Sequence, residues 1–144
     1  WFWVGACSLL SGPMFGTLSD RIGRANGLIL VFALQGTAYL LIALPLPLVS
    51  VYLAILLFGV CAWSVPSIMA AAVGDFLGPS RSAAAFGTIT LFFAIGQITG
   101  PTLAGVMAEH SGSFKSAYLL AAGLTAVAIL LARALRKTAS AENG

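Results

Sequence analysis

The sequence predicts an all-α fold, a polytopic bundle of transmembrane helices. Hydrophobic residues make up 60% of the chain and charged residues 8%, whereas soluble domains carry about 25% charged residues. The mean hydropathy is +1.02, and long uncharged runs alternate with short segments that hold most of the charges. This pattern excludes an ordinary soluble domain. The net charge of +3 therefore indicates which side the loops face rather than binding to nucleic acid.

Five membrane spans are predicted from the uncharged runs, because about 20 residues cross the hydrocarbon core. The uncharged run between Arg24 and Asp75 is too long for one crossing. Pro45 and Pro47 divide it, since neither can donate a helical hydrogen bond. The predicted spans are residues 1–19, 28–44, 51–73, 83–108 and 116–132.

Residues 1–137 are accordingly expected to form one transmembrane helical bundle, and residues 138–144, which are mostly polar, a disordered cytoplasmic tail. Because the chain opens on Trp1 inside an apolar run, we expect it to be part of a longer protein. Cys7 and Cys61 lie in separate apolar runs. They are interpreted as small packing residues rather than as a disulfide or a metal site.

The orientation follows from the basic residues in alternate loops. One side receives six of them and the other side receives only Lys115. The positive-inside rule makes the six-residue side cytoplasmic, so the C-terminus is cytoplasmic and the compartment is expected to be a bacterial plasma (inner) membrane. The six residues are Arg21, Arg24, Arg81, Arg133, Arg136 and Lys137.

The densest cluster of charge lies in the loop after the first predicted span. Asp20, Arg21 and Arg24 fall within five residues, and Gly16 and Gly23 accompany them. The order Gly-x-Leu-x-Asp-Arg-x-Gly-Arg resembles the cytoplasmic loop signature of the major facilitator superfamily, a large family of secondary transporters. On this resemblance the five residues form a conformational latch, in which the acid contacts a helix end in the other half of the transporter.

The resemblance implies a twelve-helix fold built from inverted three-helix repeats. It implies secondary active transport of a small organic solute by alternating access. The expected partners are that small-molecule substrate, the lipid bilayer and the remaining helices of the same transporter. The alternative is a non-transporting membrane scaffold or a truncated remnant, because half a transporter lacks a complete pathway.

An internal repeat agrees with this architecture. Gly12-Pro13 aligns with Gly100-Pro101 and, with one extra residue, residues 16–23 align with residues 105–112. Each copy has a Gly-Pro pair, a nearby Gly, an acid, a basic or titratable residue and a closing Gly at the end of a span. The predicted topology puts the two copies on opposite sides of the membrane, so the repeat is inverted. The third to fifth spans are then one complete unit, and the first two spans are its counterpart without an initial helix.

Two features favour the C-terminal half of such a transporter. The chain ends in a basic segment after the fifth span, and the third span lacks the intramembrane Arg that the family's N-terminal half often carries. The spans would then be helices eight to twelve. The N-terminal half is the alternative, because residues 96–105 resemble the Gly-Pro antiporter motif of its fifth helix and the charged loop is usually strongest there.

Small residues and prolines within the spans are expected to govern packing. Glycine allows close approach of helix backbones, and proline deletes a helical hydrogen bond and can bend a span. The residues expected to act in helix packing and bending are Gly12, Pro13, Pro66, Gly96, Gly100, Pro101 and Gly105.

Substrate contacts should be polar or aromatic groups at mid-membrane depth. By the resemblance, the first, third and fourth spans line the cavity. Gln97 is the first candidate, because an amide in the middle of a span is costly unless a helix, water or substrate satisfies it. For each candidate a helix–helix contact is an equally valid interpretation, and Gln35, in the second span, is interpreted only in that way. The other candidates are Trp63, Ser64, Ser67, Thr90 and Phe93.

The sequence does not indicate an enzyme. It has no nucleotide-binding loop, no cluster of metal ligands and no nucleophile paired with a base, so no cofactor or catalytic residue is expected. No acid lies inside a predicted span, and proton coupling through an intramembrane carboxylate would use helices outside this chain. His110 is expected in an outer loop.

Overall fold

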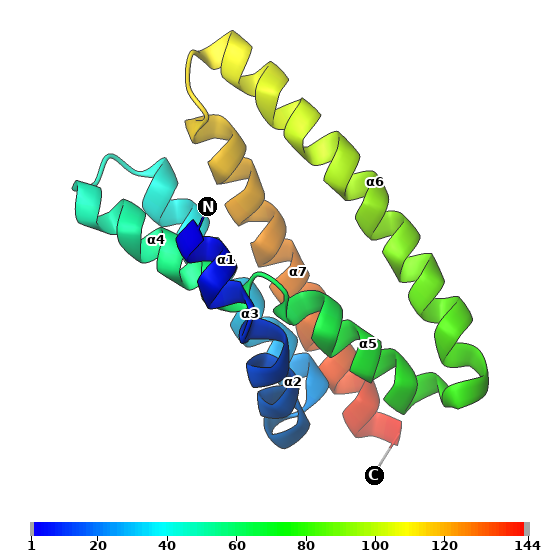
Figure 1. Cartoon of the computed structure of the whole chain (residues 1–144). Helices are drawn as coiled ribbons and strands as arrows, with labels where there is room; N and C mark the ends of the chain where they lie inside the picture. The colour runs from blue at the N-terminus through cyan, green and yellow to red at the C-terminus, as the bar shows by residue number, and fades with distance from the viewer. Residues whose placement is uncertain (1, 143–144) are drawn as a thin grey trace.

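The computed structural model describes residues 2–142, and within them the chain is entirely helical apart from short connections. The predicted all-α class is confirmed. Figure 1 shows long helices that run up and down a single bundle. The helices are α1 (Phe2–Ser8), α2 (Ser11–Ile22), α3 (Arg24–Ala43), α4 (Leu48–Cys61), α5 (Ser64–Leu77), α6 (Pro79–Ser111) and α7 (Lys115–Glu142).

Four stretches of the described chain are long and apolar enough to cross a membrane, where the sequence predicted five. They are Arg24–Ala43, Leu48–Leu77, Pro79–Ser111 and Lys115–Arg136, and they correspond to the last four predicted spans. The first predicted span is divided into α1 and α2, which have 7 and 12 residues. Residue 1 of that span lies outside the described residues.

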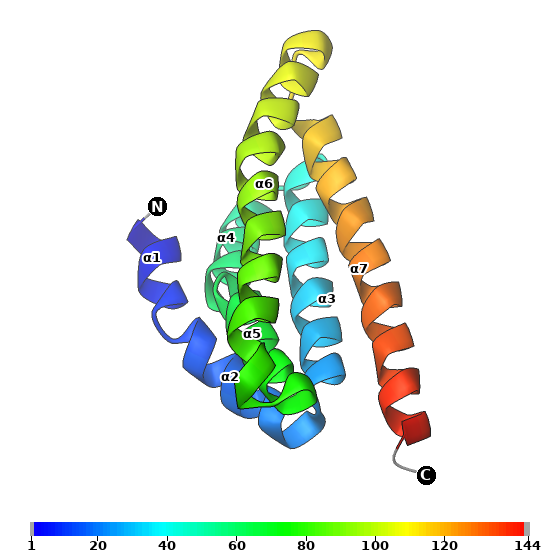
Figure 2. The same cartoon turned by 90° about the vertical axis from the view of Figure 1, so that its right-hand side faces the viewer.

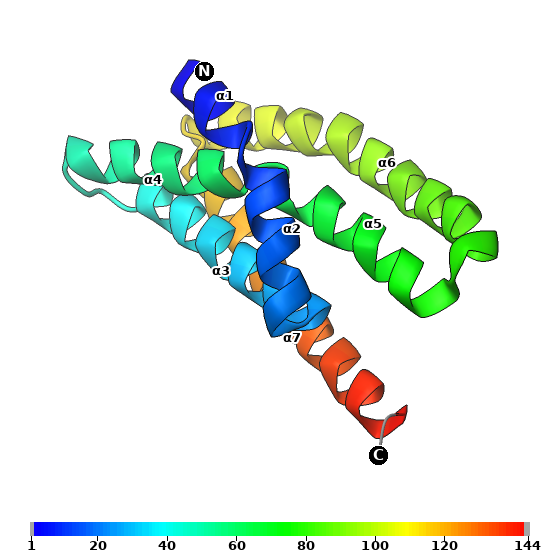
Figure 3. The same ribbon diagram turned by 60° about the horizontal axis from the view of Figure 1, so that its bottom comes forward.

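Two of the predicted spans are interrupted, and proline accounts for both interruptions. A proline has no N–H for the carbonyl four residues earlier, and its ring clashes with that carbonyl. The interruption at Leu9 and Leu10 lies just before Pro13, and the interruption at Ala62 and Trp63 lies just before Pro66. Figure 3 shows the chain changing direction between α1 and α2.

Two of the connections between helices consist of a single glycine. Gly23 alone separates α2 from α3, and Gly78 alone separates α5 from α6. Their φ angles are +91° and +70°, a region that residues with a Cβ rarely adopt. Gly112, at the end of α6, has a φ of +68°. These short connections keep the end of α2 next to the start of α3, and the end of α5 next to the start of α6.

The core lies where α2, α3, α5 and α7 meet the end of α4. α3 makes its most extensive contact with α7 and also packs on α4, while α2 packs on α5. Figure 2 shows α3 and α7 side by side. The buried cluster that joins these helices comprises Phe15, Leu28, Val31, Cys61, Ile68 and Ala132.

α6 is the least covered of the four candidate spans. None of its residues is buried, and it contacts α5 and α7. Figure 1 shows it joined to α5 at the bottom of the view and to α7 at the top, with its middle apart from the rest. Pro101 lies inside α6 without dividing it.

The end of the chain differs from the sequence-based expectation. Residues 138–144 were expected to be disordered, whereas α7 continues to Glu142. Ala139 and Ala141 favour a helix over this segment, and residues 138–143 contain neither Gly nor Pro. Residues 143 and 144 lie outside the described part of the chain.

Candidate functional site

The charged loop folds into a compact cluster around Arg24, the first residue of α3. Its Nη1 forms an ion pair with Asp20 of α2 and donates a hydrogen bond to Ser19 Oγ at 2.9 Å. Its Nε donates to Asp75 Oδ2 of α5 at 2.7 Å. One guanidinium thus joins the ends of three helices. These four residues are called the Arg24 cluster below.

Exposure in this cluster is uneven. The Arg24 side chain is 18% exposed, whereas those of Asp20 and Asp75 are 55% and 56% exposed. The carboxylates therefore keep free surface for other contacts, while the cation between them is largely enclosed. Arg21, the neighbouring base of the motif, is exposed.

The pairing of Arg24 with Asp75 was not predicted, because the two residues are 51 positions apart. The available signal was that Asp75 closes the uncharged run that begins after Arg24. The end of α7 lies at the same end of the bundle, where Arg136 Nη1 donates to Asn26 Oδ1 at 3.3 Å.

Serines link the two interruptions where α2 crosses α5. The Trp63 N–H donates to Ser11 Oγ at 3.0 Å, Ser64 Oγ donates to the Ser11 carbonyl at 3.3 Å, and Ser67 Oγ donates to the Gly12 carbonyl at 3.2 Å. Hydroxyls can satisfy backbone groups that a helix break frees inside a membrane. Ser64 and Ser67, predicted as substrate contacts, are thus occupied in a helix crossing.

Other predicted substrate residues gather around a cavity of about 630 Å³, called the central cavity below. Trp63 lines it from the junction of α4 and α5, and Phe93 and Gln97 line it from α6. Gln35 of α3, interpreted from sequence as a contact between helices, lines it too. Thr90 is not part of the lining, and its hydroxyl donates to the Phe86 carbonyl at 2.8 Å.

The lining of the central cavity is aromatic and uncharged. Besides Trp63 and Phe93 it contains Phe32, Tyr39 and Phe58, and among the described residues that line it only Tyr39, a phenol, is ionisable. Gln35 and Gln97 supply the side-chain amides of the lining. Such a site suits an organic molecule of moderate size, because ligand pockets are mostly apolar with a few placed polar groups.

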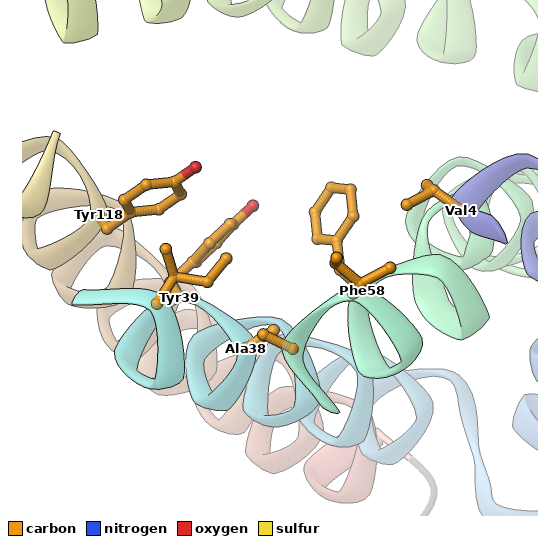
Figure 4. Close-up of a pocket in the computed structure, with 8 residues that line it drawn as sticks. Val4, Ala38, Tyr39, Phe58 and Tyr118 are labelled. Atoms are coloured by element: carbon orange, nitrogen blue, oxygen red, sulfur yellow. The ribbon is translucent and has the colours of Figure 1, made fainter. Parts of the chain in front are cut away.

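A second cavity of about 450 Å³ adjoins the first, and we call it the aromatic cavity. Tyr39 and Phe58 line both. Figure 4 shows Tyr39 and Tyr118 side by side along one wall, with Phe58 on the next helix. The ring centroid of Tyr39 lies 5.9 Å from that of Phe58 and 6.5 Å from that of Tyr118. None of these three residues is predicted from the sequence as a cavity residue.

The predicted packing glycines fall into two groups. A Cβ at Gly12 or Gly16 would meet Ser67 at 3.8 Å and 3.2 Å, respectively, so both lie in a close helix crossing. Gly96, Gly100 and Gly105 have no atom within 4 Å of such a Cβ. Within residues 2–142, no group of three His, Cys, Asp or Glu side chains could hold a metal ion.

Comparison with known proteins identifies the family. The family profile described as Major Facilitator Superfamily matches residues 2–144, almost the whole chain. The chain belongs to the major facilitator superfamily. It is therefore an integral membrane protein of a transporter family and not an enzyme.

Individual relatives match over most of this chain but only part of their own length. The class B tetracycline resistance protein of Escherichia coli is 32% identical over 114 residues, 77% of this chain and 28% of that protein. Human solute carrier family 67 member A1 is 32% identical over 130 residues, 88% of this chain and 30% of that protein. The chain thus spans less than a third of the length of these relatives. No solved structure matches it.

Proposed function

We propose that the chain is part of a secondary active transporter that moves a small organic solute by alternating access. The observation that carries this proposal is the central cavity, which brings Trp63, Phe93 and Gln97 together from separate membrane-spanning segments. An uncharged, aromatic lining with two amides suits an organic solute. The relatives named tetracycline resistance proteins make tetracycline the first compound to test.

The Arg24 cluster is proposed to act as the conformational latch. Because Arg24 holds the ends of α2, α3 and α5 together, these ends can move as one body. In alternating access one bundle rocks against another around a fixed site. The exposed carboxylate of Asp20 is proposed to contact the other half of the transporter, with Arg21 beside it. The assignment to the C-terminal half stays a prediction, which the position of residues 1–144 in the complete reading frame decides.

Transport is tested with the complete protein in proteoliposomes. Phe93→Ala and Gln97→Ala are each expected to weaken the apparent affinity for the solute by about tenfold, the effect of losing about 1.4 kcal/mol of contact. The matched control is Phe92→Ala, because Phe92 neighbours Phe93 but does not line the cavity. Uptake that is unchanged in the first two variants would remove the cavity from the mechanism. No uptake of any organic solute by the wild type would favour a scaffold.

The proposed orientation puts the Arg24 cluster and the end of α7 in the cytoplasm of a bacterial cell. It rests on the excess of basic residues on that side of the bundle. In a variant without Cys7 and Cys61, cysteines introduced as Ala25→Cys and Ser82→Cys should be shielded from an impermeant reagent added outside intact cells. Ser113→Cys should react. Labelling of the Ala25→Cys variant from outside would reverse the orientation.

A further inference from the structure

The aromatic cavity adjoins two other cavities. Val4, Tyr39 and Phe58 line both it and the central cavity. Ile42 and Tyr118 line both it and a third cavity of about 390 Å³, called the loop cavity below. The three cavities thus follow one another from the central cavity to the connections after α3 and α6. The loop cavity is also lined by Ala43, Leu44, Pro45, Ser113, Phe114 and Lys115.

The walls of the aromatic cavity suit a planar ring system. Tyr39, Phe58 and Tyr118 supply rings from α3, α4 and α7, and Val4 adds a contact from α1. The ring plane of Tyr39 is tilted by 48° to that of Phe58 and by 34° to that of Tyr118. Aromatic rings attract other rings in offset and edge-on arrangements. The volume of about 450 Å³ is within the range of about 300–1,000 Å³ that sites for small organic molecules have.

The hydroxyls of Tyr39 and Tyr118 distinguish this cavity from a purely apolar one. Both side chains are half-buried within membrane-spanning segments, and Figure 4 shows both hydroxyls pointing into the cavity. Among the described residues, neither hydroxyl has a hydrogen-bond partner. A phenol removed from water usually has such a partner, and the hydrocarbon region of a bilayer supplies none. The two hydroxyls therefore favour an occupant with hydrogen-bond acceptors over a lipid acyl chain.

We propose that the aromatic cavity is a second binding site, which holds the aromatic part of the transported solute. The occupant is a planar aromatic molecule that carries an acceptor such as a carbonyl oxygen. Its rings pack against Tyr39, Phe58 and Tyr118, and the two tyrosine hydroxyls donate hydrogen bonds to its acceptors. Tyr39 also lines the central cavity, so a solute can contact this ring from either site. The inference rests on the proposed function in one respect, that the occupant is the solute that enters the central cavity.

Binding to this site is tested by equilibrium dialysis with the complete protein in lipid nanodiscs, and empty nanodiscs correct for partition into lipid. The probes are fluorenone, a planar aromatic ketone, and fluorene, which has the same rings with a CH₂ group in place of the carbonyl. The wild type should bind fluorenone more tightly than fluorene. Tyr118→Phe keeps the ring and removes only the hydroxyl. It should weaken the binding of fluorenone about fivefold, the effect of losing one hydrogen bond, and leave the binding of fluorene unchanged.

Tyr39→Phe should have the same effect as Tyr118→Phe. Tyr52→Phe is the matched control and should bind fluorenone as the wild type does, because Tyr52 of α4 is 66% exposed and lines none of the three cavities. The proposal is overturned if the wild type shows no saturable binding of fluorenone or binds both probes equally. An unchanged affinity of Tyr118→Phe for fluorenone would also overturn it, even if Tyr39→Phe binds more weakly, since Tyr39 borders the central cavity as well.

The two proposals fail in different ways. Weaker binding of fluorenone by Tyr118→Phe, together with a wild type that transports no organic solute, would refute the proposed function and leave the binding site in place. Transport that depends on Phe93 and Gln97, together with binding of fluorenone that Tyr118→Phe does not change, would overturn this inference and leave the proposed function in place.

Discussion

Replacing Arg24 with glutamine is expected to remove most of the transport by the complete protein while leaving much of its folded abundance. The guanidinium joins Asp20, Asp75 and Ser19, and a neutral amide leaves two carboxylates close together without a cation. Because both carboxylates are more than half exposed, the cost in folding free energy is about 1 kcal/mol or less. The three helix ends would no longer be held as one unit, and this connection is what the proposed latch requires.

Two further variants separate charge from geometry in the Arg24 cluster. Arg24→Lys keeps the positive charge but cannot direct separate donors to three partners, so intermediate transport is expected. Asp20→Asn keeps the shape of the acid and should impair transport and shift the balance of inward- and outward-open states. Uptake, and the accessibility of the central cavity from outside, are compared at matched membrane abundance. Full transport by Asp20→Asn with unchanged accessibility would reduce the loop to a topology signal.

Replacing Gly27 with leucine is expected to destabilise the bundle by about 3 kcal/mol, at the upper end of the usual cost of overpacking. A Cβ at this position would lie 2.7 Å from Ser19 Cβ and 3.3 Å from Ser19 Cα. The second atom belongs to the backbone of α2, so the clash cannot be relieved by a side-chain rotation. Ser19 also accepts the hydrogen bond from Arg24, and the Arg24 cluster should be displaced as well.

The effect of Gly27→Leu is measured as thermal unfolding and as the yield of folded protein in detergent. Gly74→Leu is the matched control, because Gly74 lies within α5 and a Cβ there meets no atom within 4 Å. Gly27→Ala should fall between the control and Gly27→Leu. Equal stability of the leucine variants at positions 27 and 74 would show that α2 and α3 are not closely packed at Ser19.

The sequence predicts the helical class, because that class depends on where charges interrupt long apolar runs. It does not predict which prolines divide a helix. Pro13 and Pro66 lie near interruptions that Ser11, Ser64 and Ser67 join by hydrogen bonds, whereas Pro101 lies in an unbroken α6. The outcome depends on the neighbouring helix, and a local pattern carries no information about that neighbour.

The candidate site was predicted only in part, because the sequence does not show which helix lies next to each side chain. Trp63, Phe93 and Gln97 line one cavity, since large side chains reach away from their own helix. Ser64 and Ser67 lie close to Trp63 in the sequence, but their short hydroxyls bond to backbone carbonyls of α2. Asp75 and Arg24 are 51 positions apart in the sequence. They become neighbours only because α3 and α5 pack together in the fold.

The single-residue connections at Gly23 and Gly78 hold two pairs of helices close together at this end of the bundle. Both lie beside the Arg24 cluster, so the helices that they join cannot separate there without breaking the fold. α6 extends 33 residues from Gly78, which makes it about 50 Å long at 1.5 Å per residue. If α6 rotated by about 10° about Gly78 as a rigid helix, Ser111 at its other end would move by about 9 Å. A small change of angle at the glycine end would thus give a large displacement of the loop between α6 and α7.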